Sequence, residues 1–94
     1  MQTITSIDDA VALVGHELGV SGWKAIDQQR INDFADVTED RQLIHTDVEH
    51  AKAESQYGST IAHGYLTLSL IPAMSKDNYR IMGRMTINYG LNKV

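Results

Sequence analysis

Three short helices are predicted in the first half of the chain, because a polar cap residue precedes apolar residues at helical spacing in each. The predicted helices run from Ser6 through Val14 with Asp9 completing a capping-box variant, from Gln28 to about Ala35 after Asp27, and from Val48 to Glu54 after Asp47. Ile31, Phe34 and Ala35 share one face of the second helix. The polar, glycine-containing stretch between Ser55 and Ile61 indicates a loop.

The second half of the chain contains a longer apolar segment. From Gly64 to about Lys76 apolar residues occur on nearly every side of a helical projection, which is typical of a helix buried inside a sheet. Leu66, Leu70 and Ile71 are expected to be buried there. Pro72 removes one backbone hydrogen bond, so a kink is expected near it.

A single strand is predicted after this helix. Apolar and polar residues alternate from Met85 to Leu91, the pattern of a half-buried strand. One strand is too little to cover a buried helix, and its edges would offer unpaired backbone groups to another chain. We therefore expect the chain to form a homodimer or larger homo-oligomer, in which the segment Met85–Val94 pairs with its counterpart or packs over a partner's helix. Exchange of such a segment between copies is one route to the dimer.

Composition and charge narrow the classes of protein that fit this pattern. The chain has 94 residues, enough for one domain spanning residues 1–94, and 43% of them are hydrophobic. Its net charge of −4 argues against nucleic acid or an anionic membrane as the main partner. There is no cysteine, which excludes disulfides and thiolate metal sites. Neither a signal peptide at residues 1–6 nor a membrane span is indicated, so a cytoplasmic location is expected.

Candidate chemistry is concentrated in two places. Asp40 and His45 lie five positions apart across a predicted turn, and His63 and Gly64 stand at the start of the apolar helix. A carboxylate can hold a water molecule and take its proton, and an imidazole can donate or accept a proton near neutral pH. A backbone N–H at the first turn of a helix can stabilise an enolate oxygen. From spacing alone, an Asp that caps a turn and a His in a polar loop would be the commoner outcome.

Other chemistries are less well supported. Imidazole and carboxylate ligands for zinc or iron are available from His45, Asp47, His50 and His63. However, His45 and His50 lack the i, i+4 spacing that places two ligands on one helical face, so we expect no metal. No serine lies in a Gly-x-Ser-x-Gly context, and no glycine-rich phosphate loop is present.

Two segments of the chain together resemble a known family. The stretch FADVTEDRQLIHTD begins at Phe34 and the stretch GSTIAHGYLTLS begins at Gly58. Their combination of Asp-x4-His with a later Ala-His-Gly is similar to the MaoC-like dehydratases, or (R)-specific enoyl-CoA hydratases. The ending INYGLNKV is similar to one bacterial branch of the family, and the likeness runs from about Trp23 to the last residue.

The resemblance implies an α+β hot-dog fold, in which a curved antiparallel sheet wraps a long buried helix. Domains of this family are usually dimers and continue with three further strands beyond the one predicted at Met85–Leu91. The expected domain, residues 1–94, would thus be the N-terminal portion of a hot-dog domain. Its sheet would be completed by oligomerisation or by strands of another chain, unless the chain is truncated.

The resemblance also implies a reaction and the residues that perform it. Asp40 and His45 would hold the water that adds to a trans-2-enoyl-CoA thioester to give the (R)-3-hydroxyacyl-CoA, a step of fatty acid metabolism. Gly64 would donate its N–H to the thioester oxygen, and His63 and Gln42 would line the substrate site. Gln42 stands where relatives often carry Asn. No cofactor is expected, since coenzyme A enters as part of the substrate.

Two further functions remain open from the sequence. The chain could be a catalytically inactive fragment that acts as an assembly or binding module. Alternatively, it could be a hot-dog acyl-CoA thioesterase in which Asp40 activates water against the carbonyl. Release of a free thiol would indicate the thioesterase, and loss of enoyl absorbance would indicate the hydratase.

Overall fold

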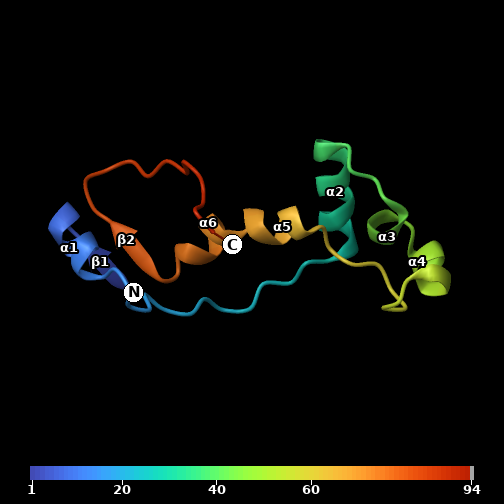
Figure 1. Ribbon diagram of the computed structural model, residues 1–94, viewed down its shortest axis with the longest axis horizontal. Helices are drawn as coiled ribbons and strands as arrows, with labels where there is room; N and C mark the ends of the chain where they lie inside the picture. The colour runs from blue at the N-terminus through green and yellow to red at the C-terminus, as the bar shows by residue number, and fades with distance from the viewer. Residues whose placement is uncertain (94) are drawn as a thin grey trace. The chain divides into compact units, whose positions relative to one another are not determined.

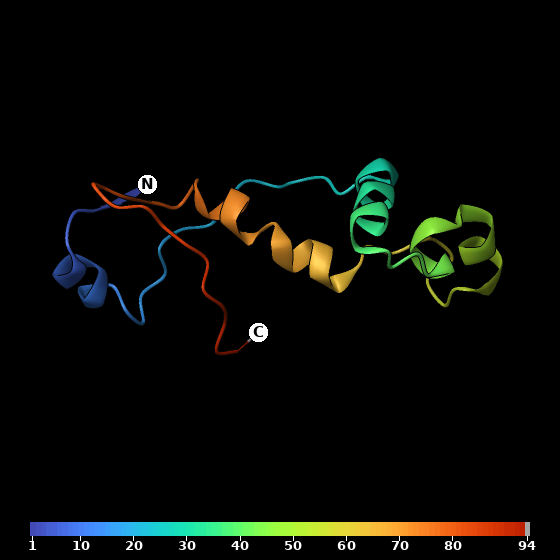
Figure 2. The same cartoon turned by 90° about the horizontal axis from the view of Figure 1, so that it is seen from above.

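The computed structural model describes residues 1–93 of the chain. Two compact units can be distinguished: unit 1 contains residues 1–22 together with residues from 73 onward, and unit 2 contains residues 23–72. The helices and strands of both units are labelled in Figure 1 and seen from above in Figure 2. None of the helices in the described part of the chain is long and apolar enough to cross a membrane.

Unit 2 is helical. Its elements are α2 (Gln28–Thr38), α3 (Leu43–Thr46), α4 (Val48–Glu54) and α5 (Gly64–Ser69). Helix α3 contacts both α2 and α4, and the three lie side by side (Figures 1 and 2). The predicted caps are confirmed: the Asp27 carboxylate accepts the Arg30 N–H at 2.9 Å, and the Asp47 carboxylate accepts the His50 N–H at 2.9 Å.

The core of unit 2 is small and contains two histidines. Its buried apolar side chains are Ile31, Ala35, Ala51 and Leu66. The imidazoles of His45 and His63 are buried among the same elements, at 8% and 2% exposure. The predicted face of α2 is confirmed at Ile31 and Ala35, while Phe34 is half-buried. The core therefore packs around the residues that carry the candidate chemistry.

Unit 1 contains a two-stranded sheet and one short helix. Strands β1 (Gln2–Ile4) and β2 (Tyr79–Ile81) are parallel, with Gln2 opposite Tyr79 and Ile4 opposite Ile81. Helix α1 (Ile7–Ala12) is capped by Ser6, whose hydroxyl accepts the Asp9 N–H at 3.0 Å. This confirms the predicted cap, although the helix ends before Val14. Neither strand was predicted, because three residues are too few to show an alternating pattern.

The predicted long helix is interrupted. Helix α5 ends at Ser69, and α6 (Ile71–Ser75) begins after a break at Leu70. Pro72 explains the break, since it has no N–H to donate and its ring crowds the carbonyl four residues earlier. Burial is confirmed for Leu66, but the prediction was wrong for Leu70, which is half-buried, and for Ile71, which is 44% exposed.

The predicted strand at Met85–Leu91 is not formed in the described residues, and its apolar side chains are exposed. A strand needs a hydrogen-bonded partner, and β1 pairs instead with β2. Val94, the end of the segment expected to pair with a second copy, lies outside the described residues. The structure thus contains mixed helix and sheet, but the described residues do not contain the wrapped antiparallel sheet.

Candidate active site

The end of α2 and the single turn of α3 bring Asp40 and His45 together. Helix α2 is terminated by Glu39, which adopts a left-handed conformation with a φ of 65°. The chain then turns, and the His45 N–H donates to the Gln42 carbonyl at 3.0 Å in the helical turn. Leu43 and Ile44 are exposed, because α3 turns His45 inward instead. The predicted meeting of Asp40 and His45 is therefore found, in a turn closed by backbone hydrogen bonds.

The loop before α5 is joined to this turn by the backbone and by His45. The Ile61 N–H donates to the Ile44 carbonyl at 3.0 Å. In return, His45 Nδ1 lies 2.8 Å from the Ile61 carbonyl oxygen. A carbonyl oxygen can only accept, so Nδ1 carries the proton and donates. In a neutral His45 ring, Nε2 therefore keeps its lone pair, as a base that holds a water requires.

His63 makes a similar bond in the opposite direction. Its Nε2 lies 2.9 Å from the backbone carbonyl oxygen of Asp40, so Nε2 carries the proton and donates. Nδ1 of His63 is buried and has no hydrogen-bond partner among residues 1–93. The His63 ring is packed between two aromatic neighbours: it stacks on His45 with ring centres 3.9 Å apart and meets Phe34 at 4.9 Å with a tilt of 57°.

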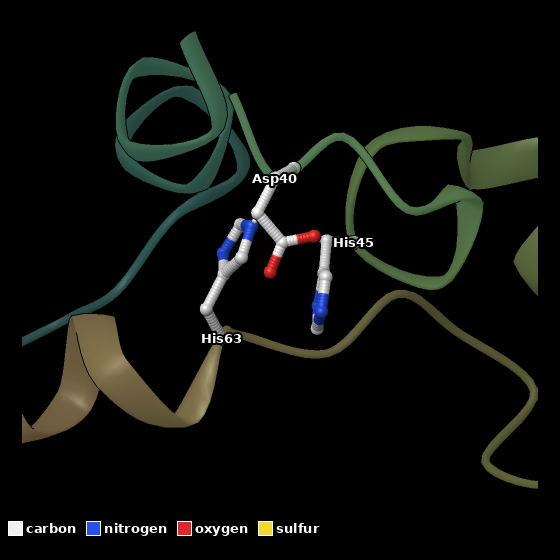
Figure 3. A group of neighbouring side chains, drawn as sticks. All are labelled: Asp40, His45 and His63. Carbon is white, nitrogen blue, oxygen red and sulfur yellow. Dashed lines mark hydrogen bonds between the residues drawn. The ribbon is translucent and has the colours of Figure 1, made fainter. Parts of the chain in front are cut away.

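The Asp40 carboxylate completes a cluster of three polar side chains. Asp40, His45 and His63 each contribute one atom to a group in which all three atoms lie within 4.8 Å of one another. Figure 3 shows the Asp40 carboxylate directed toward the two imidazoles, with Asp40 coming from the turn after α2 and His63 from the start of α5. Within the described residues, no direct hydrogen bond joins the carboxylate to either ring.

The spacing of this cluster suits a bridging water. Two polar atoms that share one tetrahedral water, each at about 2.8 Å, lie about 4.6 Å apart. One carboxylate oxygen of Asp40 and one ring nitrogen of His45 lie within 4.8 Å of each other, which is compatible with this separation. A carboxylate oxygen can accept one proton of such a water and an unprotonated imidazole nitrogen can accept the other, which leaves an oxygen lone pair for reaction.

The same cluster is a poor arrangement for a single metal ion. An ion bonded to two imidazoles lies close to the plane of each ring, which requires the two lone pairs to converge. The rings of His45 and His63 are stacked 3.9 Å apart with only 23° between their planes, so no point close to both rings lies in both planes. Asp47 and His50, the other proposed ligands, are not part of the cluster among the described residues, since the Asp47 carboxylate caps α4. The expectation of a metal-free site stays a prediction.

Gly64 and Gln42, the other expected site residues, lie next to the cluster. Gly64 is the first residue of α5, where backbone N–H groups have no partner within the helix. A Cβ built on Gly64 would meet no described atom within 4 Å beyond its chain neighbours and its own helix backbone, so the Cβ side of this residue is open. Gln42 is exposed and contributes its backbone carbonyl, which accepts the N–H of His45. Their predicted contacts with substrate remain predictions.

Gln28 is a site residue that the sequence did not indicate. Its side-chain nitrogen donates to the backbone carbonyl of His45 at 2.8 Å and to Asn32 at 2.9 Å. Its side-chain oxygen accepts the Thr60 hydroxyl at 2.6 Å. Gln28 thus connects the start of α2 to the His45 turn and to the loop before α5. Only the Gln28–Asn32 pair has a sequence signal, the i, i+4 spacing, because the other partners are distant in sequence.

A known domain family and several known proteins are similar to this chain. Residues 9–94 match the MaoC like domain. The 3-hydroxyacyl-thioester dehydratase Z of Mycobacterium tuberculosis is 46% identical over 95 residues, which cover 100% of this chain and 62% of that protein. Nodulation protein N of Rhizobium meliloti is 49% identical over 94 residues, which cover 95% of this chain and 56% of that protein.

The domain match and the sequence identities with these relatives assign the chain to the same family and the same fold class. The chain spans about three-fifths of the length of these relatives and aligns with them almost throughout. Its helices and two-stranded sheet are compatible with an incomplete hot-dog fold. The expected α+β hot-dog fold class is therefore confirmed, and the chain belongs to the MaoC-like dehydratase family.

Proposed function

We propose that the protein catalyses the reversible, (R)-specific hydration of trans-2-enoyl-CoA thioesters to (R)-3-hydroxyacyl-CoA thioesters. In this reaction the oxygen of water forms a bond to C3 as the C2=C3 π bond breaks, and a proton is added to C2. In the dehydration direction, the same steps run in reverse. Asp40 and His45 hold the water and carry its protons, and the thioester oxygen bears negative charge in the transition state.

The observation that carries this proposal is the geometry of Asp40 and His45. The carboxylate and a ring nitrogen are close enough to share one water, and the Ile61 carbonyl fixes the His45 proton on Nδ1. The relative named 3-hydroxyacyl-thioester dehydratase Z supports the choice of substrate class. Reacting groups held in one geometry lower the barrier by removing the entropy of bringing them together.

The proposal also assigns a role to each of the other residues that were expected in the site. Gly64 donates its N–H to the thioester oxygen, since its place as the first residue of α5 leaves that N–H without a partner within the helix. We also propose that Gln42 lines the substrate site, whereas His63, which the resemblance placed there, is buried at 2% exposure and acts through its neighbours. Coenzyme A is part of the substrate, and the reaction needs no metal or redox cofactor.

The proposal extends to the assembly and the setting of the protein. Many large apolar side chains of the described residues are exposed, including Trp23 and Tyr89, and a second copy of the chain is proposed to cover some of them. The homodimer, which exchange of the segment around residues 85–93 could form, would complete the hot-dog sheet. A cytoplasmic role in fatty acid metabolism is proposed with it.

Substitution of the two reacting groups tests the reaction. Asp40→Asn and His45→Gln each remove one proton acceptor from the water while keeping the size of the side chain. Each variant is expected to lose about 10²- to 10⁴-fold in kcat for hydration of crotonyl-CoA, measured by the loss of enoyl absorbance. Unchanged thermal unfolding would show that each variant is folded.

A matched control and a second assay make the result decisive. His16→Gln replaces an exposed imidazole of unit 1 and is expected to leave activity unchanged. Retention of near wild-type kcat by Asp40→Asn or His45→Gln would remove that residue from the mechanism. Release of free thiol without loss of enoyl absorbance would replace the hydratase by a thioesterase, and absence of both would favour an inactive binding module.

A further inference from the structure

The two histidines of the site bind each other's segments reciprocally. His45, on the turn after α2, donates from Nδ1 to the carbonyl of Ile61 on the loop before α5. His63, at the start of α5, donates from Nε2 to the carbonyl of Asp40 on the turn after α2. The backbone bond from Ile61 N–H to Ile44 lies between these two contacts. The two segments are thus closed on each other at three points, and the two rings stack in the space between them.

We propose that His63 is a positioning residue, whose Nε2–H holds the Asp40 backbone while its ring supports His45. This inference rests on the proposed function, because it assigns His63 a task for the Asp40–His45 pair. Asp40 follows directly after the left-handed Glu39, and its N–H makes a long contact of 3.4 Å with the Thr38 hydroxyl at the end of α2, which restrains the Asp40 carbonyl weakly. The bond from His63 to the Asp40 carbonyl adds a second restraint from 23 residues later in the chain.

The burial of His63 argues against a direct contact with substrate. Only 2% of its surface is exposed, and one face of its ring packs on His45 while Phe34 packs at a tilt. Of its two nitrogens, Nε2 is engaged by Asp40, and Nδ1 is buried. A substrate could reach the ring only by displacing one of these neighbours. Its effect on the reaction therefore passes through Asp40 and His45.

The two functions of the His63 side chain can be separated by substitution. In His63→Gln the side-chain amide nitrogen reaches about as far as Nε2, so the donor to the Asp40 carbonyl is kept without the aromatic ring. In His63→Phe the ring and its stacking on His45 are kept, but the donor is lost. If the donor positions Asp40, His63→Gln should retain more activity than His63→Phe, although Phe is the closer match in shape.

Kinetics distinguish positioning from substrate binding. We expect His63→Phe to lose about 10- to 100-fold in kcat with KM within about twofold of wild type, and His63→Gln to recover most of that loss. His16→Gln serves as the matched control for removal of an imidazole elsewhere in the chain. A rise in KM with unchanged kcat in both His63 variants would overturn the proposal in favour of a substrate contact. Equal kcat in His63→Phe and wild type would overturn it as well.

A spectroscopic measurement on the wild-type protein is independent of turnover. In protein labelled with ¹⁵N-histidine, we expect neutral His63 to carry its proton on Nε2 and neutral His45 to carry its proton on Nδ1. The carbonyl ¹³C shift of Asp40 should move in His63→Phe and stay close to wild type in His63→Gln. A proton on Nδ1 of His63 would refute the inference even if the enzyme is active. If no acyl thioester is converted, the proposed function fails, while these shifts still decide whether His63 holds Asp40.

Discussion

The imidazoles of His45 and His63 are each held by a backbone carbonyl group. A carbonyl oxygen takes up no proton in the range where proteins are folded, so the proton on the bonded nitrogen stays in place when nearby side chains titrate. Which nitrogen of His45 remains available to a water is therefore set by the main chain at Ile61. The main-chain carbonyls of Ile61 and Asp40 thus determine which nitrogen of each imidazole carries the proton.

A second residue-level feature is the contact between Thr5 and Asp9 in unit 1. The Thr5 hydroxyl donates to the Asp9 carboxylate at 2.6 Å, and the Thr5 N–H adds a weaker contact at 3.4 Å. These bonds favour the ionised carboxylate and lower the pKa of Asp9 below its ordinary value. A lowered pKa stabilises the fold above the unfolded-state pKa, and this stabilisation is lost as the pH falls through the folded-state pKa.

Removal of the hydroxyl should reverse most of this shift. In Thr5→Val the main cause of the lowered pKa is absent, so the pKa of Asp9 is expected to rise toward its ordinary value. The measurement is an NMR titration of the Asp9 carboxyl carbon. Thr3→Val, in the neighbouring strand β1, is the control and should leave the titration unchanged. An unaltered Asp9 midpoint in Thr5→Val would show that the hydroxyl does not hold the carboxylate.

At the scale of the elements, the break between α5 and α6 changes which side chains form the core. Pro72 ends the regular hydrogen bonding, so the apolar residues on either side no longer share one continuous helix face. Leu66, on α5, is 4% exposed, whereas Ile71, on α6, is 44% exposed. Apolar residues of similar size in one sequence pattern therefore contribute very differently to stability.

Alanine substitutions should reveal this difference. Leu66→Ala removes a buried side chain and leaves a cavity, which is expected to lower the free energy of unfolding by about 2–5 kcal/mol. Ile71→Ala is the matched comparison and should change it by less than about 1 kcal/mol. Chemical denaturation followed by circular dichroism measures both values. A larger effect at Ile71 than at Leu66 would mean that the predicted continuous helix is the correct description.

The sequence predicted the features of the fold that depend on neighbouring residues. The caps at Ser6, Asp27 and Asp47 are confirmed because a side chain and a backbone N–H three residues later suffice to make them. The prediction of a strand at Met85–Leu91 was wrong. The alternation of apolar and polar residues shows only that a segment could pair, and not whether a partner strand is present.

In the candidate site, too, the sequence predicted the residues but not the contacts between distant parts of the chain. Asp40, His45 and His63 were found from residue type and family resemblance, and the structure brings them together. The bonds that hold them were not predicted, because each joins residues at least 16 positions apart and ends on a backbone carbonyl. Every residue has such a carbonyl, so no sequence pattern marks the ones that are used.

On the scale of the whole molecule, the described residues expose more large apolar side chains than they bury. The buried apolar residues are Ile4, Ile31, Ala35, Ala51 and Leu66. Exposed ones include four in the segment Met85–Leu91, namely Met85, Ile87, Tyr89 and Leu91. Contiguous exposed apolar surface is typical of a face that another protein chain covers.

Light scattering at micromolar concentration tests the proposed assembly. We expect a dimer or larger species, because association removes apolar side chains from water. Replacing Ile87 and Leu91 by Lys should shift the equilibrium toward the monomer, whereas Val14→Lys, at an exposed apolar position outside this segment, should not. A monomer that unfolds cooperatively would contradict the expectation.

The parallel pairing of β1 with β2 has a consequence for the order in which the chain acquires structure during synthesis. Residue 2 finds its partner only when residue 79 has been made, whereas the internal contacts of unit 2 form within residues 23–72. Chains emerge from the ribosome N-terminus first, and local contacts form sooner than distant ones. Unit 2 can therefore fold while strand β1 is still without its partner strand. The segments linked by His45 and His63 would thus be folded before strand β1 pairs with β2.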